Sequence, residues 1–200
     1  MTTAIDIGFT ETVKAIQTRK GSRQAYANSQ WQSEITDDLA AYITQMRSVF
    51  VSTVNAQGYP YTQHKGGPAG FLHVMDRNTI AFADFKGNRQ FISQGNLQDN
   101  PRTFLFMIDF VNRQRIKFWG HSEIIEDDPD LLEKLMPDQS SYRARPEQVF
   151  KFTVEAWNAN YTQHITQRID AEHVSRMLQE KDARIAELEA AIEGIGGTGA

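Results

Sequence analysis

The sequence contains no cysteine among its 200 residues. Disulfide frameworks, thiolate nucleophiles and cysteine-ligated metal sites are therefore excluded. Long apolar runs are also missing, because no segment has the length needed to span a membrane and residues 1–8 are too mixed for a signal peptide. We expect a cytoplasmic protein that folds without covalent cross-links and has no membrane partner.

Charge of one sign is not in large excess. The chain has 21 Lys and Arg against 25 Asp and Glu, for a formal net charge of -4. Nucleic-acid-binding domains usually carry a basic surface, so we expect no nucleic-acid partner. A local basic pocket for one phosphate remains compatible with this charge, and we expect a small-molecule ligand. The histidines and carboxylates do not follow a metal-ligand spacing such as His-x-x-x-His, so we predict no metal site.

The apolar pattern is mainly that of short β-strands. Strands are predicted at residues 49–54, 61–65, 71–75, 80–85, 103–110, 116–125 and 149–157. Helices are predicted after Thr10, over residues 35–46, after Asn88 and after Asp128. Six or more antiparallel strands with few helices indicate a mainly β fold, a β-barrel with peripheral helices. In the last strand, strict alternation places Phe152 and Val154 inward and Trp157 outward.

Residues 171–200 are predicted to form a C-terminal helix and flexible tail after a main domain at 1–170. The helix has apolar residues at heptad-like spacing, interrupted by Lys181: Val174, Leu178, Ile185, Leu188 and Ile192. Two interpretations remain open, because such a stripe serves equally to pack on the chain's own core or to form a short coil with another subunit. Residues from Gly194 to Ala200 are predicted to be the flexible tail.

The segment Phe82–Gln90 has the pattern of a phosphate site. It ends a strand, turns at Gly87 and is predicted to open a helix with Asn88 as N-cap. The amides after Asn88 would then be free donors at the positive end of a helix, and Arg89 would add a guanidinium in the first turn. Such an arrangement binds a phosphate dianion. A capped helix with a solvated arginine is the alternative interpretation.

Three stretches together resemble the pyridoxamine 5'-phosphate oxidase-like flavoproteins: residues 61–71, 82–90 and 157–168. The resemblance runs from about residue 9 to 170. It implies an antiparallel, FMN-binding split β-barrel with N-terminal helices and a C-terminal helix. It also implies that FMN lies at the interface of a homodimer.

Carried over by position, the resemblance implies a set of cofactor-binding residues. Asn88, Arg89 and Gln90 would hold the flavin phosphate. The strand residues Phe82, Ala83 and Asp84 would run beneath the ring system, and Lys65 would approach the flavin. The second subunit would contribute Asn112, Arg113, Trp157, Gln163, His164 and Arg168. An ordinary rim aromatic at Trp157 and a structural histidine at His164 remain the alternatives.

The resemblance fails at the C-terminus. True pyridoxamine 5'-phosphate oxidases end in a strand region and an Arg-Leu-x-Pro type terminus that holds the substrate phosphate, whereas this chain ends in a helix rich in Glu and Ala. Tyr161-Thr162 also stands where close subgroups have Cys-Pro. We therefore expect an FMN-dependent oxidoreductase that takes electrons from a small-molecule substrate or a nicotinamide donor. We do not expect it to oxidise vitamin B6. The alternative is a non-catalytic sensor or carrier that binds flavin, haem or deazaflavin.

Overall fold

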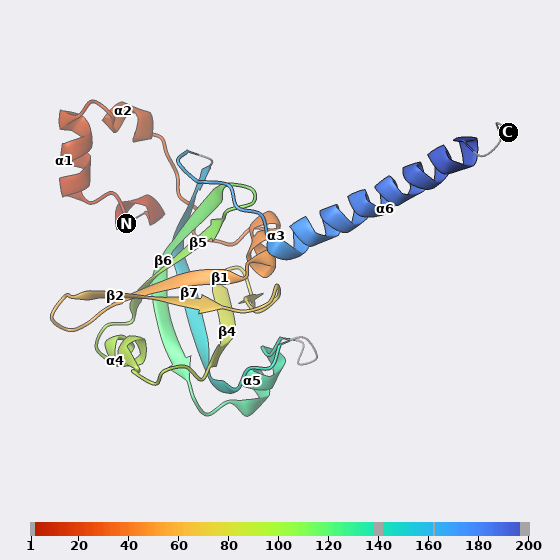
Figure 1. Cartoon of the computed structure of the whole chain (residues 1–200). Helices are drawn as coiled ribbons and strands as arrows, with labels where there is room; N and C mark the ends of the chain where they lie inside the picture. Colours follow the sequence, from red (N-terminus) through yellow and green to blue (C-terminus); the bar gives the residue numbers. More distant parts are fainter. Residues whose placement is uncertain (1–2, 138–141, 162, 197–200) are drawn as a thin grey trace. The chain divides into compact units, whose positions relative to one another are not determined.

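The computed structural model describes residues 3–137, 142–161 and 163–196 (Figure 1). The chain divides into two compact units, Met1–Asp109 with Gln114–Tyr161 and Phe110–Arg113 with Thr162–Ala200. The first unit contains the β-sheet, and the second contains the long helix α6 (Ala171–Gly196). No helix in the described part of the chain is both long and apolar enough to cross a membrane.

The described residues of the first unit form one antiparallel sheet of seven strands in the order β2-β1-β5-β6-β7-β4-β3. The strands are β1 (Ser48–Val54), β2 (Pro60–Gly66), β3 (His73–Val74), β4 (Thr79–Phe85), β5 (Arg102–Asp109), β6 (Gln114–Ile125) and β7 (Pro146–Tyr161). The predicted mainly β fold with peripheral helices is confirmed. The strand expected at 71–75 is wrong in extent, because it is reduced to the two residues of β3.

The described residues of the first unit also form short helices. They are η1 (Ala4–Ile7), α1 (Glu11–Arg19), α2 (Arg23–Tyr26), α3 (Asp37–Gln45), α4 (Ile92–Asp99) and α5 (Pro129–Lys134). The predicted caps of α1 and α5 are confirmed, because Thr10 Oγ1 accepts from the Val13 amide at 3.3 Å and Asp128 Oδ1 accepts from the Leu131 amide at 2.9 Å.

Alternating residues of the strands supply the core of the first unit. Val51 of β1, Leu105 of β5, Phe118 of β6 and Phe152 of β7 are all fully buried, as a sheet with one face toward the core requires. Helix α3 adds Ile43 to the same cluster. This core fixes the strands that carry the candidate site.

Trp157 does not face outward as the alternation predicts. The pairing of β6 with β7 shifts register between Trp119 and Gly120, which marks a β-bulge. Trp157 packs against the core, and its indole Nε1 donates to the Glu34 carbonyl at 2.8 Å. A Cβ at Gly120 would lie 1.9 Å from the Thr153 carbonyl oxygen, so the close strand approach at this bulge requires glycine.

Helix α6 is longer than the sequence pattern predicts. It continues to Gly196, so the expectation of a flexible tail from Gly194 is wrong for the residues up to Gly196. The remaining residues of the predicted tail, 197–200, lie outside the described part of the chain.

Candidate functional site

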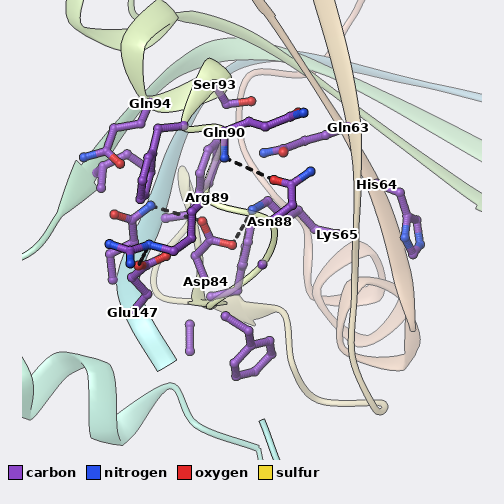
Figure 2. A pocket seen from close by; sticks show the side chains of 18 of the residues that line it. Gln63, His64, Lys65, Asp84, Asn88, Arg89, Gln90, Ser93, Gln94 and Glu147 are labelled. Atoms are coloured by element: carbon purple, nitrogen blue, oxygen red, sulfur yellow. Dashed lines mark hydrogen bonds and ion pairs between the residues drawn. The ribbon is translucent and has the colours of Figure 1, made fainter. Parts of the chain in front are cut away.

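A cavity of about 390 Å³ lies in the first unit, where β2, β4, β7 and the start of α4 meet. Small-molecule pockets usually measure about 300–1,000 Å³. Side chains from these elements converge on the cavity (Figure 2). Its lining includes seven residues that the sequence assigned to cofactor binding: Lys65, Phe82, Ala83, Asp84, Asn88, Arg89 and Gln90.

A buried carboxylate holds a lysine at one side of the cavity. Lys65, near the end of β2, donates from Nζ to Asp84 Oδ1 on β4. The second oxygen of Asp84 accepts from Gln148 Nε2 at 3.2 Å, because the β4–β7 register places Asp84 opposite Gln148. Asp84 is only 7% exposed. Asp84 therefore has both oxygens engaged and fixes the direction of the Lys65 ammonium, since charge-assisted hydrogen bonds are strong and directional.

The base of the cavity is apolar and aromatic. The rings of Phe82 and Phe150 stack with their centroids 4.9 Å apart, and Phe71 meets Phe82 edge-on at 6.0 Å. All three side chains are fully buried. They give the cavity a rigid apolar floor beside the polar Lys65–Asp84 pair.

The predicted helix start at Asn88 is wrong. Helix α4 begins at Ile92, and Phe91 is its N-cap residue. The Asn88 side chain instead accepts a hydrogen bond from the Gln90 amide at 3.2 Å (Figure 2). Arg89 and Phe91 adopt left-handed conformations with φ of 58° and 52°. A local turn, closed by a side-chain-to-backbone hydrogen bond, therefore competes with the helix, and α4 begins only at Ile92.

The start of α4 at Ile92 still presents backbone N–H donors to the cavity. The first amides of a helix lack intrahelical partners, and Ile92, Ser93 and Gln94 line the cavity at this point. Among the described residues, Ser93 Oγ and Gln94 Oε1 are buried side-chain atoms without a hydrogen-bond partner. Ser93 as a residue is 6% exposed. Buried polar groups nearly always have partners in native proteins, and these two are the atoms of this kind that border the cavity in the described part of the chain. A ligand in the cavity would find hydrogen-bonding groups here.

Arg89 is held only loosely beside this helix start. Its Nε lies 3.8 Å from Glu147 Oε1, and its side chain is 59% exposed. The guanidinium also lies 5.6 Å from the centroid of the Phe91 ring. Exposed ion pairs of this length contribute little stability, so Arg89 can exchange Glu147 for a stronger anionic partner at small cost.

His64 borders the cavity, but its ring is already engaged. Its Nε2 lies 2.7 Å from Ser48 Oγ, and Figure 2 shows the ring on the other side of β2 from the remaining labelled side chains. Within the described residues, no group of three His, Asp or Glu is arranged to hold a metal ion.

The residues predicted to reach a second subunit are not in this cavity. Trp157 lies on β7 of the first unit, whereas the others belong to the second unit: Asn112, Arg113, Gln163, His164 and Arg168. There, the guanidinium of Arg168 lies 4.6 Å from the centroid of the Phe110 ring. Arg113 and His164 have φ of 53° and 61°. Their contacts with a partner's cofactor stay a prediction.

Sequence reasoning gave no role to several residues that line the cavity, four of which are polar residues of the candidate site: Ser93, Gln94, Glu147 and Gln148. Ser93 and Gln94 were assigned no role because the helix start was placed too early. Glu147 and Gln148 come from the first residues of β7, and their position beside Asp84 depends on the strand register. No local motif signals that register.

Comparison with known proteins finds one family whose match covers all the residues that line the cavity. The family described as Pyridoxamine 5'-phosphate oxidase matches residues 35–161, which include every residue of the cavity. No protein with a curated description gives a significant match.

Several solved structures are similar to this chain at low sequence identity. A variant of HupZ from Group A Streptococcus is 19% identical, with 63% of this chain and 99% of that chain covered and a TM-score of 0.50. HutZ, the heme storage protein from Vibrio cholerae, is 16% identical over 64% of this chain and 94% of that chain, with a TM-score of 0.44.

An FMN-binding protein from Syntrophomonas wolfei subsp. wolfei is 12% identical over 77% of this chain and 98% of that chain, with a TM-score of 0.44. The match to HupZ, at a TM-score of 0.50 and 19% identity, shows a shared fold and leaves the ligand open. The family match covers more than half of the chain and all of its sheet strands. The chain therefore belongs to the pyridoxamine 5'-phosphate oxidase family.

Proposed function

We propose that this chain binds FMN in the cavity and acts as an FMN-dependent oxidoreductase. The observation that carries the proposal is the pair of buried, unpartnered atoms Ser93 Oγ and Gln94 Oε1 at the start of α4. A ligand that accepts from the first and donates to the second would remove the cost of burying them, which is about 1–3 kcal/mol for each group.

The chemistry of this end of the cavity fits the ribityl phosphate of FMN. A phosphate oxygen accepts from the Ser93 hydroxyl and from the free amides of the first turn of α4, where the helix dipole is positive. Arg89 supplies the countercharge once it releases Glu147. Gln94 Oε1 is an acceptor, so it suits a ribityl hydroxyl and not the phosphate.

Another part of the cavity lining fits a flat, partly polar ring. Phe82 and Phe150 provide the apolar base, and Lys65 provides a cation whose direction Asp84 fixes. When bound, a flavin accepts a hydride and later gives up its electrons, and protein groups near its ring tune this chemistry. The role of Lys65 would be to place positive charge at the electron-rich edge of the ring.

The cavity favours FMN over haem. A haem-binding pocket needs an axial ligand such as His, and His64 is the histidine that borders the cavity. Its Nε2 is hydrogen-bonded to Ser48 Oγ, and its ring lies on the other side of β2 from the other labelled side chains (Figure 2). Among the described residues, a haem iron in the cavity would therefore lack a positioned histidine ligand.

The proposal includes a homodimer in which the second subunit completes the site. The family resemblance assigns the partner's contribution to Asn112, Arg113, Gln163, His164 and Arg168. Trp157 is the least suited of the predicted set, because its indole N–H already donates to Glu34 of its own chain. Its ring remains available only for apolar contact.

The test begins with the small molecule that copurifies. We expect denatured protein to release a compound with the mass of FMN and absorption bands near about 375 and 450 nm. NADH or NADPH should then reduce the bound flavin faster than it reduces free FMN at equal concentration. A Soret band or a deazaflavin mass would contradict the cofactor assignment, and reduction no faster than that of free FMN would contradict the enzyme assignment.

A further inference from the structure

Helix α6 carries a stripe of apolar side chains that the chain leaves exposed. It is one uninterrupted helix of 26 residues, drawn in blue in Figure 1. The exposed fractions are 39% for Val174, 56% for Leu178, 52% for Ile185, 47% for Leu188 and 69% for Ile192. Amphipathic helices gain most of their stability by burying such a stripe, so it needs a partner surface.

The spacing of the stripe is that of a coiled coil. From Val174 to Ile192 the steps alternate between four and three residues when Lys181 is counted. This pattern assigns Leu178, Ile185 and Ile192 to a positions, and Val174, Lys181 and Leu188 to d positions. Ile185 at a followed by Leu188 at d is the combination that favours two parallel strands. Lys181 is the charged residue at a d position of the seam, and burying its charge there lowers the stability of the pair.

The flanking charges select the orientation. Arg184 occupies a g position and Glu189 an e position. In a parallel pair, g of one helix meets e of the other five residues further on, so Arg184 meets Glu189 of a second copy. In an antiparallel pair, g meets g and e meets e, so like charges would face each other. Within its own helix, Arg184 makes only an exposed pair with Glu187, which leaves it free to change partner.

We infer that α6 is a dimerisation helix that forms a parallel, in-register, two-stranded coiled coil with a second copy of this chain. The occupant of the stripe is the same stripe, because both its heptad spacing and its flanking charges are self-complementary. This inference does not rest on flavin binding, since none of its residues lines the cavity.

The absence of cysteine from the chain provides a clean test. A disulfide requires Cα atoms about 4.4–6.8 Å apart, so a single introduced cysteine reports whether two equivalent positions meet. The full-length variant Leu178→Cys places the thiol in the seam. Ala183→Cys places it on the exposed outer face of the same helix and is the matched control. Ile192→Cys is a second seam position if Leu178→Cys fails to melt cooperatively.

Under mild oxidation at micromolar concentration, we expect the seam variants to form covalent dimers at least about tenfold faster than Ala183→Cys. The same result should hold with and without added FMN. Equal rates for the seam and control variants would overturn the inference. So would cross-linking seen only when Leu178→Cys is mixed with Leu188→Cys, because in an antiparallel pair two copies of position 178 would lie roughly 15 Å apart along the axis.

Discussion

The cavity and α6 both present groups that the described chain leaves unsatisfied, but of opposite kinds. In the cavity, Ser93 and Gln94 each have a polar atom that is buried without a partner. On α6, side chains such as Leu178 and Ile185 are apolar and exposed. A buried polar atom is relieved by a ligand with the complementary hydrogen-bonding group, whereas an exposed apolar stripe is relieved by another apolar surface.

The difference assigns the two regions to separate tasks. Changes in the cavity should alter the affinity for FMN and leave self-association through α6 unchanged. Changes in the α6 seam should alter association through α6. At protein concentrations at which the dimer persists, they should leave the affinity for FMN largely unchanged. The following variants test whether the two regions can be separated in this way.

The largest effect is expected for Arg89→Ala. It removes the guanidinium that supplies the phosphate countercharge, so the dissociation constant for FMN should rise about 10- to 100-fold, as for loss of a charge-assisted hydrogen bond. The control is Arg77→Ala, because Arg77 also has a glutamate 3.8 Å away and is similarly exposed, but lies outside the cavity. Fluorescence titration measures both. Equal affinities for the two variants would remove Arg89 from the site.

The next effect is expected for Lys181→Leu. It replaces the one charged residue of the seam, so the dimer dissociation constant measured by sedimentation should fall about tenfold. Arg176→Leu makes the same kind of change on the outer face of α6 and should leave association unchanged. If the dimer dissociation constant fell equally in both variants, added hydrophobicity and not the seam position would be responsible for the tighter association.

A smaller effect is expected for Ser93→Ala. The affinity for FMN should fall about five- to tenfold through loss of one hydrogen bond from a neutral donor, which contributes about 1 kcal/mol. The stability of the protein without FMN should stay the same or rise, because an unpartnered buried hydroxyl is removed.

Ser122→Ala is the control for Ser93→Ala. Ser122 Oγ is also buried and unpartnered, but it lies outside the cavity. This variant should reproduce the stability change without any change in FMN affinity. Loss of stability in Ser93→Ala alone would indicate a structural hydroxyl and not a ligand contact.

The smallest expected effect is on the pH dependence of stability. It involves neither the cavity nor α6. Burial is the main cause that lowers the pKa of His73 below its usual value, and the nearby charge of Lys134 acts in the same direction. The unfolded chain therefore binds a proton more readily than the folded chain, so stability is lost as pH falls through about 6.5. Thermal melts at pH 7 and 5 should show a smaller loss for His73→Gln than for the wild type. His173→Gln, at an exposed histidine of α6, is the control.

Local patterns predicted the elements whose ends are set by local contacts. The caps at Thr10 and Asp128 depend on hydrogen bonds within three residues, and the heptad of α6 is a property of one helix. These features are visible in a sequence because no distant segment alters them.

The sequence could not predict features that depend on competition or on strand register. Asn88 is a good N-cap residue, yet it forms a turn with Gln90, and α4 starts at Ile92. Gln148 reaches Asp84 only through the β4–β7 pairing. Trp157 was assigned to the wrong face because the bulge between β6 and β7 breaks the alternation. Each error arises because the prediction used the local residue pattern alone, and that pattern does not show the competing hydrogen bond or the strand pairing.

The most direct test of the central claim compares FMN with riboflavin, which differ only in the phosphate. If the phosphate binds at the start of α4 beside Arg89, the wild-type protein should bind FMN at least about 30-fold more tightly than riboflavin, which corresponds to about 2 kcal/mol. Titration of the flavin-free protein, followed by flavin fluorescence, measures both constants. Equal affinities for FMN and riboflavin would contradict the account, because the helix start, Ser93 and Arg89 would then have no phosphate to bind.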